Sequence, residues 1–236
     1  MVTTVEKAPV GELSPRLQTM KAGLILGKAR LDVERLRFLE EGYSETEGQP
    51  TLLRRAQLLE GLFLKKTLLV DDNPIIGTVT QYKTGVYPYP EFSCGWMQRE
   101  TSFMTHVAPV EVTPEDQEVL ERAVQQWKDR CVWAAVSEEA KGQGFQASTF
   151  VKSGVWADDI WFPQGFCNLN YPKVLNRGVL SLIEEAEERQ RRAPTAEKKL
   201  FYEAALVTLK GLLRWVARYA ALLREMAGQE ADPQRA

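Results

Sequence analysis

The sequence predicts a mainly α-helical fold with a few short strands. Apolar residues recur at helical spacing in several long segments, which is the main sequence signal of amphipathic helices. Residues that start helices stand in front of these segments, and prolines and glycines separate them. Hydrophobic residues make up 44% of the 236 residues, so the chain can bury a real core. Together these observations favour one large helical domain.

Five segments carry the helical pattern. Residues 1–12 precede them and are expected to form a flexible lead-in, so the predicted domain covers residues 13–236. The first pattern opens at Ser14-Pro15, continues to about residue 39 and is interrupted by two glycines. Thr113 is predicted to cap another helix, because a threonine followed by proline and two acids is typical of a helix start. The four later helices are predicted at residues 51–66, 113–132, 172–191 and 195–228.

Short extended pieces and long loops are predicted between the helices. Residues 67–70 are apolar and run into a cluster of turn residues, which is typical of a strand and a turn. Residues 75–78 are interpreted as a second short extended piece. Residues 80–112 and 142–170 are irregular and rich in aromatic residues, which indicates ordered loops that pack.

Composition and charge disfavour several classes of protein. The net charge of −2 argues against a nucleic-acid binder, which normally has a strongly basic face. No apolar run reaches the length that spans a bilayer, so we expect no membrane partner. The first residues lack the apolar stretch of a signal peptide. A cytoplasmic protein is the expectation.

Cysteine and histidine usage gives no sign of a metal or redox site. The three cysteines, Cys94, Cys131 and Cys167, are widely spaced and form no C-x-x-C pair. This spacing argues against a disulfide framework and against ligation of zinc or an iron–sulfur cluster. His106 is the only histidine, and its neighbours are typical of an exposed connection, so we interpret it as non-catalytic.

A series of short runs in a fixed order carries the specific signal. The first run, Thr46-Glu47-Gly48-Gln49-Pro50 followed by Arg54-Arg55-Ala56, is the most specific part. The other runs are Glu34-Arg35, Ile75-Ile76-Gly77, Tyr89-Pro90-Glu91-Phe92, Thr113-Pro114-Glu115-Asp116, Asn170-Tyr171-Pro172-Lys173 and Phe201-Tyr202-Glu203-Ala204. This order resembles the N-terminal region of glycyl radical enzymes of the pyruvate formate-lyase type, over residues 13–233. One departure is Asn73-Pro74, where the family usually has an acid and a leucine.

The resemblance implies the N-terminal helical portion of the glycyl radical enzyme α/β barrel, with the barrel incomplete in this chain. In the family, a glycine near the C-terminus stores a radical that an S-adenosylmethionine iron–sulfur activase installs. A mid-chain cysteine then becomes a thiyl radical, and a nearby glutamate acts as a base. Neither the cysteine motif nor the glycine loop occurs in this sequence, and none of its cysteines matches the motif. We therefore expect this chain to bind no cofactor itself and to be inactive alone.

The resemblance also implies one wall of a substrate pocket. The residues before Tyr171 approach the substrate in the family, and here they resemble a segment of arylacetate-decarboxylating members. Aromatic side chains there would suit an aromatic or arylacetate-like substrate, and an amide could donate a hydrogen bond to a carboxylate. The alternative is that the aromatic residues belong to the core and that the glutamine lies at the surface. The predicted pocket residues are Phe166, Trp161, Phe162, Gln164 and Trp156.

These observations favour the N-terminal part of a glycyl radical lyase that cleaves a C–C or C–X bond. Its expected partners are the remainder of the barrel, in the same or a separate chain, and the radical activase, and a homodimer is left open. The alternative is a standalone helical interaction or scaffold module derived from such an enzyme. An independent acid–base enzyme is disfavoured, because no paired carboxylates lie at an informative spacing on an apolar face. The charged residues Glu47, Arg54, Arg55 and Glu91 are interpreted as structural, making helix caps and charge-assisted hydrogen bonds.

Overall fold

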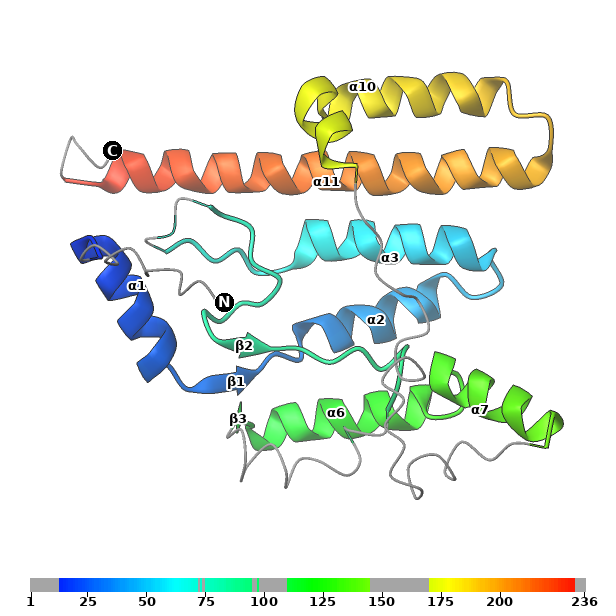
Figure 1. The fold of residues 1–236 in the computed structure, drawn as a ribbon, viewed down its shortest axis with the longest axis horizontal. Coiled ribbons are helices and arrows are strands. Elements are labelled where there is room, and N and C mark those ends of the chain that lie inside the picture. The colour runs from blue at the N-terminus through cyan, green and yellow to red at the C-terminus, as the bar shows by residue number, and fades with distance from the viewer. Residues whose placement is uncertain are drawn as a thin grey trace, which may run out of the picture.

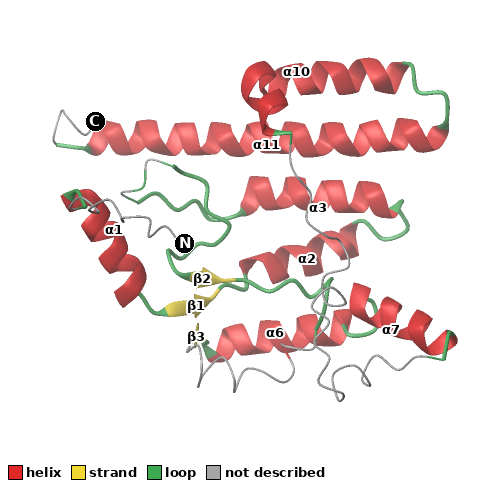
Figure 2. Ribbon diagram, in the orientation of Figure 1, coloured by secondary structure: helices red, strands yellow, loops and turns green. Residues whose placement is uncertain are grey.

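A computed structural model describes residues 13–71, 73, 75–94, 97, 110–144 and 170–231. The described chain is mainly helical, with three short strands, as the sequence predicts (Figure 2). The helices are α1 (Pro15–Leu26), α2 (Glu34–Glu45), α3 (Thr51–Lys65), α6 (Pro114–Trp127), α7 (Val132–Gly142), α10 (Tyr171–Arg191) and α11 (Ala196–Gln229). The strands are β1 (Ala29–Leu31), β2 (Gly85–Val86) and β3 (Val110–Glu111).

The helices are stacked in layers. From top to bottom in Figure 1, α10, α11, α3, α2 and α6 follow one another, with α1 and the strands at one end. Each helix of this stack contacts the next, and the contact between α3 and α11 is the most extensive. The 34-residue helix α11 therefore lies between the α10 layer and the α3 layer.

Local cap chemistry places several helix starts where the sequence predicts them. The Thr113 hydroxyl accepts a hydrogen bond from the backbone N–H of Asp116 at 3.1 Å, and Pro114 begins α6. Ser14 caps α1 and Thr195 caps α11 in the same way. Each cap satisfies a backbone N–H that has no partner inside its helix. Asn170 similarly caps α10, which the sequence analysis did not predict.

A parallel sheet replaces the predicted strand at residues 67–70. In the sheet, β1 lies between β2 and β3, and Arg30 pairs with Gly85 on one side and with Glu111 on the other. Residues 67–70 are not a strand. Side chains of α11 bind the backbone here instead: Tyr219 donates to the Leu69 carbonyl at 3.4 Å, and Arg218 donates to the carbonyl of the preceding Lys66 at 2.8 Å.

Two predicted helices are interrupted. The first pattern divides at Gly27 into α1, then β1 and α2, and the predicted helix at 113–132 stops at Trp127. A new helix, α7, begins at Val132. Its first N–H groups, those of Val132 and Trp133, donate to the carbonyls of Glu91 and Phe92 at 2.9 Å, so an adjacent loop caps α7.

A kink divides α10 into two parts. Gly178 has φ of 72° and ψ of 166°, a conformation that residues with a side chain rarely adopt. Beyond the kink, Glu185 forms ion pairs with Lys173 and Arg177 from the first part and with Arg189 from its own part. These ion pairs hold the pKa of Glu185 below its usual range, with the hydrogen bond from Lys173 as the largest cause.

The core is concentrated in two clusters. The larger cluster joins the sheet to α2, α3 and α6, and Leu31, Leu36 and Leu120 are almost completely buried within it. Tyr43 packs edge-on against Trp127 beside this cluster, with ring centroids 4.8 Å apart. The smaller cluster lies between α10 and α11. Among the residues that the structure describes, no helix is both long and apolar enough to cross a membrane.

Candidate functional site

The predicted pocket wall lies outside the described residues. Phe166, Trp161, Phe162, Gln164 and Trp156 all fall between residues 144 and 170, where the structure gives no description. Their roles therefore stay predictions. The charged residues that carry the family resemblance are mostly described, and Arg35, Glu91 and Glu34 among them take part in two polar junctions.

The first junction joins α2 to the loop that follows β2. The Arg35 guanidinium forms a bidentate ion pair with the Glu91 carboxylate, and one of the two hydrogen bonds measures 3.0 Å. Arg35 also donates to the Pro88 carbonyl at 3.2 Å and lies 4.3 Å from the centre of the Tyr89 ring. The Arg35 and Glu91 side chains are only 16% and 19% exposed. We call this set the Arg35–Glu91 junction.

Tyr89 is held at the rim of this junction. Its hydroxyl donates to the hydroxyl of Tyr87 at 2.8 Å, and its ring also packs against Phe92. Burial raises the pKa of the Tyr89 phenol to about 12, and the hydrogen bond with Tyr87 adds to the increase. The phenol therefore stays protonated at neutral pH, and its contacts fix the loop on α2.

A second arginine, Arg54, binds the C-terminal end of α2. Arg54 on α3 donates to the Tyr43 carbonyl at 2.6 Å and to the Thr46 hydroxyl at 3.2 Å, and it lies over the Tyr43 ring. Carbonyls in the last turn of a helix lack partners within that helix, and Arg54 supplies one. The structural interpretation of Arg54 and Glu91 is confirmed. Glu47 and Arg55 are exposed.

The second junction was missed by sequence reasoning. Asp32, 2% exposed at the end of β1, accepts hydrogen bonds from the backbone N–H of Glu34 at 2.9 Å and of Gln81 at 2.7 Å. The Glu34 carboxylate in turn accepts from the backbone and the hydroxyl of Thr67. These partners come from three separate segments of the chain, so no local sequence pattern indicates that they meet.

Lys66 lies beside this second junction and is buried. Burial lowers the pKa of its ammonium group, while the nearby charges of Glu34 and Asp32 act in the opposite direction. Its Nζ donates to the Thr67 carbonyl at 3.3 Å. The Lys66 backbone carbonyl accepts the hydrogen bond from Arg218 on α11. The arrangement joins the end of α3 to the sheet and to α11.

The described cysteines are unsuited to nucleophilic chemistry. Cys94 and Cys131 are free and buried. Burial raises the pKa of the Cys94 thiol to about 12, and its neighbour Cys131 adds to the increase. The Cys94 thiol donates to the Pro90 carbonyl at 3.5 Å. A buried, protonated thiol of this kind is a poor nucleophile.

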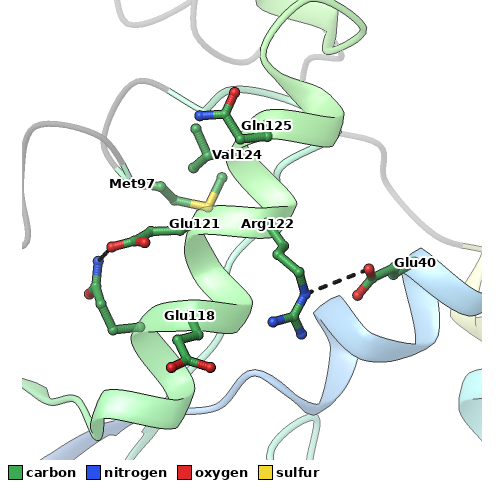
Figure 3. Close-up of a pocket in the computed structure, with 8 residues that line it drawn as sticks. Glu40, Met97, Glu118, Glu121, Arg122, Val124 and Gln125 are labelled. Carbon is green, nitrogen blue, oxygen red and sulfur yellow. Dashed lines mark hydrogen bonds and ion pairs between the residues drawn. The ribbon is translucent and has the colours of Figure 1, made fainter.

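An open hollow of about 810 Å³ lies along α6, facing α2 (Figure 3). Its polar residues bind one another: Gln117 donates to Glu121 at 2.9 Å, and Arg122 lies 3.7 Å from Glu40 on α2. Across the part of the chain that the structure describes, no three His, Cys, Asp or Glu side chains are grouped as metal ligands. We find no set of groups in this hollow arranged for catalysis.

Comparison with known proteins identifies the family to which these layered helices and junctions belong. Residues 12–236 match the family model described as Pyruvate formate lyase-like. The chain therefore belongs to this family. Its relatives are glycyl radical enzymes, and it corresponds to their N-terminal part.

Curated relatives include two kinds of lyase. The isethionate sulfite-lyase of Nitratidesulfovibrio vulgaris is 29% identical, in an alignment that covers 88% of this chain and 27% of the relative. The (2S)-3-sulfopropanediol dehydratase of Klebsiella oxytoca is 27% identical, over 94% of this chain and 28% of the relative. The chain thus spans little more than a quarter of the length of the relatives it matches.

Solved structures show the same fold. A glycyl radical enzyme from Archaeoglobus fulgidus superposes with a TM-score of 0.80 and 25% identity, over 93% of this chain and 29% of that one. A protein of 1,2-propanediol dehydration from Roseburia inulinivorans also has a TM-score of 0.80, at 22% identity, over 95% of this chain and 29% of that one. The second likeness concerns the fold alone.

Proposed function

We propose that this chain is the N-terminal portion of a glycyl radical lyase that breaks a carbon–heteroatom bond, or a C–C bond, in a small substrate. The observation that carries the proposal is the family match over residues 12–236. The curated relatives are a sulfite-lyase and a dehydratase, which are lyases that cleave C–X bonds. The two junctions and Arg54 agree with a scaffold, since their charged groups bind protein groups.

The chemistry is proposed to reside in the remainder of the enzyme. This sequence contains neither the family's cysteine motif nor its glycine loop. The remainder of the barrel and the radical activase are the proposed partners, and the cytoplasm is the proposed location. In this proposal the chain on its own carries no radical and is inactive.

Residues 1–236 are proposed to supply one wall of the substrate pocket through Phe166, Trp161, Phe162, Gln164 and Trp156. Aromatic rings would pack against an aromatic or arylacetate-like substrate, and the Gln164 amide would donate to its carboxylate. The basis is the resemblance of this segment to arylacetate-decarboxylating members. Phe166 is the residue on which this substrate class chiefly depends.

Electron paramagnetic resonance after anaerobic activation tests whether the radical resides in the remainder of the enzyme. The complete enzyme that begins with this region is expected to show a glycyl doublet, whereas the 236-residue chain alone should show none. A doublet on the isolated chain would overturn the proposal.

Steady-state kinetics of the complete enzyme test the pocket wall. Phe166→Ala should raise KM for an arylacetate substrate about 10-fold or more, since an apolar pocket contact contributes roughly 10–200-fold in discrimination. Phe201→Ala is the matched control, because Phe201 is 55% exposed on α11 and far along the chain from the pocket segment. Equal KM values for the two variants would remove Phe166 from the pocket.

A further inference from the structure

Helix α1 carries an apolar stripe without being buried. None of its 12 residues is buried. Leu17, Met20 and Leu24 follow one another at spacings of three and four, so they lie on one side of the helix. Leu17 is 42% exposed and Leu24 is 57% exposed. A helix this short is marginal in water without a packed face, so we expect the stripe to pack against another surface.

The stripe forms one side of a small hollow. Met20 and Leu24 of α1 face the segment that follows α3, and together they enclose about 130 Å³. The opposite apolar wall consists of Leu69, Ile75 and Ile76. A cavity of about 150 Å³ lined by aliphatic side chains is large enough to bind benzene. The hollow beside α1 is slightly smaller than that cavity and has room for one branched aliphatic side chain.

The polar rim of the hollow is satisfied from within this chain. Asp71 and Lys83 line it and form an ion pair at 3.3 Å. The backbone N–H of Asn73 donates to the Asp71 carboxylate at 2.9 Å, and this bond is the largest cause that holds the pKa of Asp71 below its usual value. An apolar centre within a polar rim is the usual anatomy of a protein interface. A partner at this surface needs no charge of its own.

The two segments that line the hollow carry further exposed apolar side chains. Ile75 is 81% exposed, and Val79 in the same segment is 64% exposed. At the end of α1, Ile25 and Leu26 are 69% and 80% exposed. Soluble proteins seldom leave many large apolar side chains of neighbouring segments in water unless another surface covers them.

We propose that the hollow between α1 and residues 69–83 is the surface on which the downstream portion of the enzyme docks, inserting one large apolar side chain between Leu24 and Ile75. This inference rests on the proposed function, because the occupant is the part of a glycyl radical lyase that follows this region. The occupant is chosen by length: this chain covers 27–29% of its relatives, so most of the surface available to cover α1 belongs to the remaining part.

Thiol labelling tests the docking without disturbing the fold. Leu24→Cys and Ile75→Cys are each made in the 236-residue chain and in the complete enzyme, and maleimide labelling is followed for each peptide by mass spectrometry. Ala22→Cys is the matched control, because Ala22 is exposed on α1 and points about 160° away from Leu24 at 100° per residue. Circular dichroism melting of each variant confirms that it is folded.

The expected result is at least 10-fold slower labelling of Cys at positions 24 and 75 in the complete enzyme than in the isolated chain, with less than a threefold change at position 22. Equal rates in the two proteins would overturn the proposal. Slow labelling at position 24 in the isolated chain that becomes fast on dilution would assign the hollow to a second copy, and would also overturn it.

The glycyl doublet, measured on the same complete enzyme, separates the two proposals. A doublet without protection at positions 24 and 75 leaves the proposed function standing and refutes the docking surface. Protection without a doublet supports the docking surface and counts against the radical lyase.

Discussion

The Arg35–Glu91 junction offers a measurable test of how this fold is held together. Replacing Glu91 with Gln removes the negative charge opposite Arg35 and leaves the guanidinium mostly buried. Removing one partner of a buried ion pair costs about 3–5 kcal/mol. Arg35 keeps the Pro88 carbonyl and the Tyr89 ring, and both partners of the pair remain 16–19% exposed. We therefore expect Glu91→Gln to lower the free energy of unfolding by about 2–3 kcal/mol.

A double-mutant cycle isolates the ion pair from these other effects. Arg35→Met, Glu91→Gln and the double variant are compared by urea unfolding of the 236-residue chain, followed by far-UV circular dichroism. Two charge-assisted hydrogen bonds in a partly buried site predict a coupling energy of about 2 kcal/mol. The matched control is the pair of Arg122 and Glu40, which is 3.7 Å apart and about half exposed.

The control pair should show no measurable coupling, because exposed ion pairs are screened by water and salt. A coupling energy below about 0.5 kcal/mol for Arg35 and Glu91 would refute the reasoning. The loop at residues 88–92 would then be held on α2 mainly by its other contacts, which include the hydrogen bond from Arg35 to the Pro88 carbonyl.

Four further predictions concern the single positions Gly61, Gly211 and Cys94. Gly61→Ala should stabilise the chain by about 0.5–1 kcal/mol in urea unfolding, because α3 has open space for the added methyl group. Gly211→Ala should instead destabilise it by about 1 kcal/mol, because the methyl group would meet the Cα of Glu60 at 3.1 Å between α11 and α3; stabilisation would show that the two helices can separate at no cost. Cys94 should resist iodoacetamide at pH 8 until urea unfolds the chain, and rapid labelling of the native chain would contradict its burial. Folding raises the pKa of the Cys94 thiol from 9.0 to about 12, so its contribution to the free energy of unfolding is full below pH 9 and declines between pH 9 and 12. The free energy of unfolding of Cys94→Ala should therefore fall less steeply with pH over that range.

Helix starts were predictable because their signals are local. The Thr113 cap, the following proline and the acidic first turn lie within four residues, and the structure confirms this start. The strands were missed for the opposite reason. Each has two or three residues, too few to show an alternating pattern, and β1 pairs with partners more than 50 residues away. Residues 67–70 looked like a strand by composition, but α11 binds their backbone.

The contacts within the two junctions were not predictable from local sequence patterns. Arg35 and Glu91 are 56 residues apart, and nothing in either neighbourhood indicates that they meet. The same holds for Asp32 and Gln81, whose contact depends on how the sheet places two loops. The family resemblance did identify the family, because it compares the whole order of motifs along the chain. The pocket wall at residues 156–166 remains a prediction.

The stacking of α11 on α3 has a consequence for synthesis of the protein. Arg218 binds the Phe63 carbonyl across 155 residues of sequence, so α3 is made long before its main partner. At about 5–20 residues per second, roughly 8–30 s separate the two. During this interval Ala56, Leu59 and the rest of the α3 surface that faces α11 lack their final cover. The hairpin of α10 and α11 is local and can form quickly, so late docking of this hairpin on α3 is the slow, aggregation-sensitive step for the growing chain.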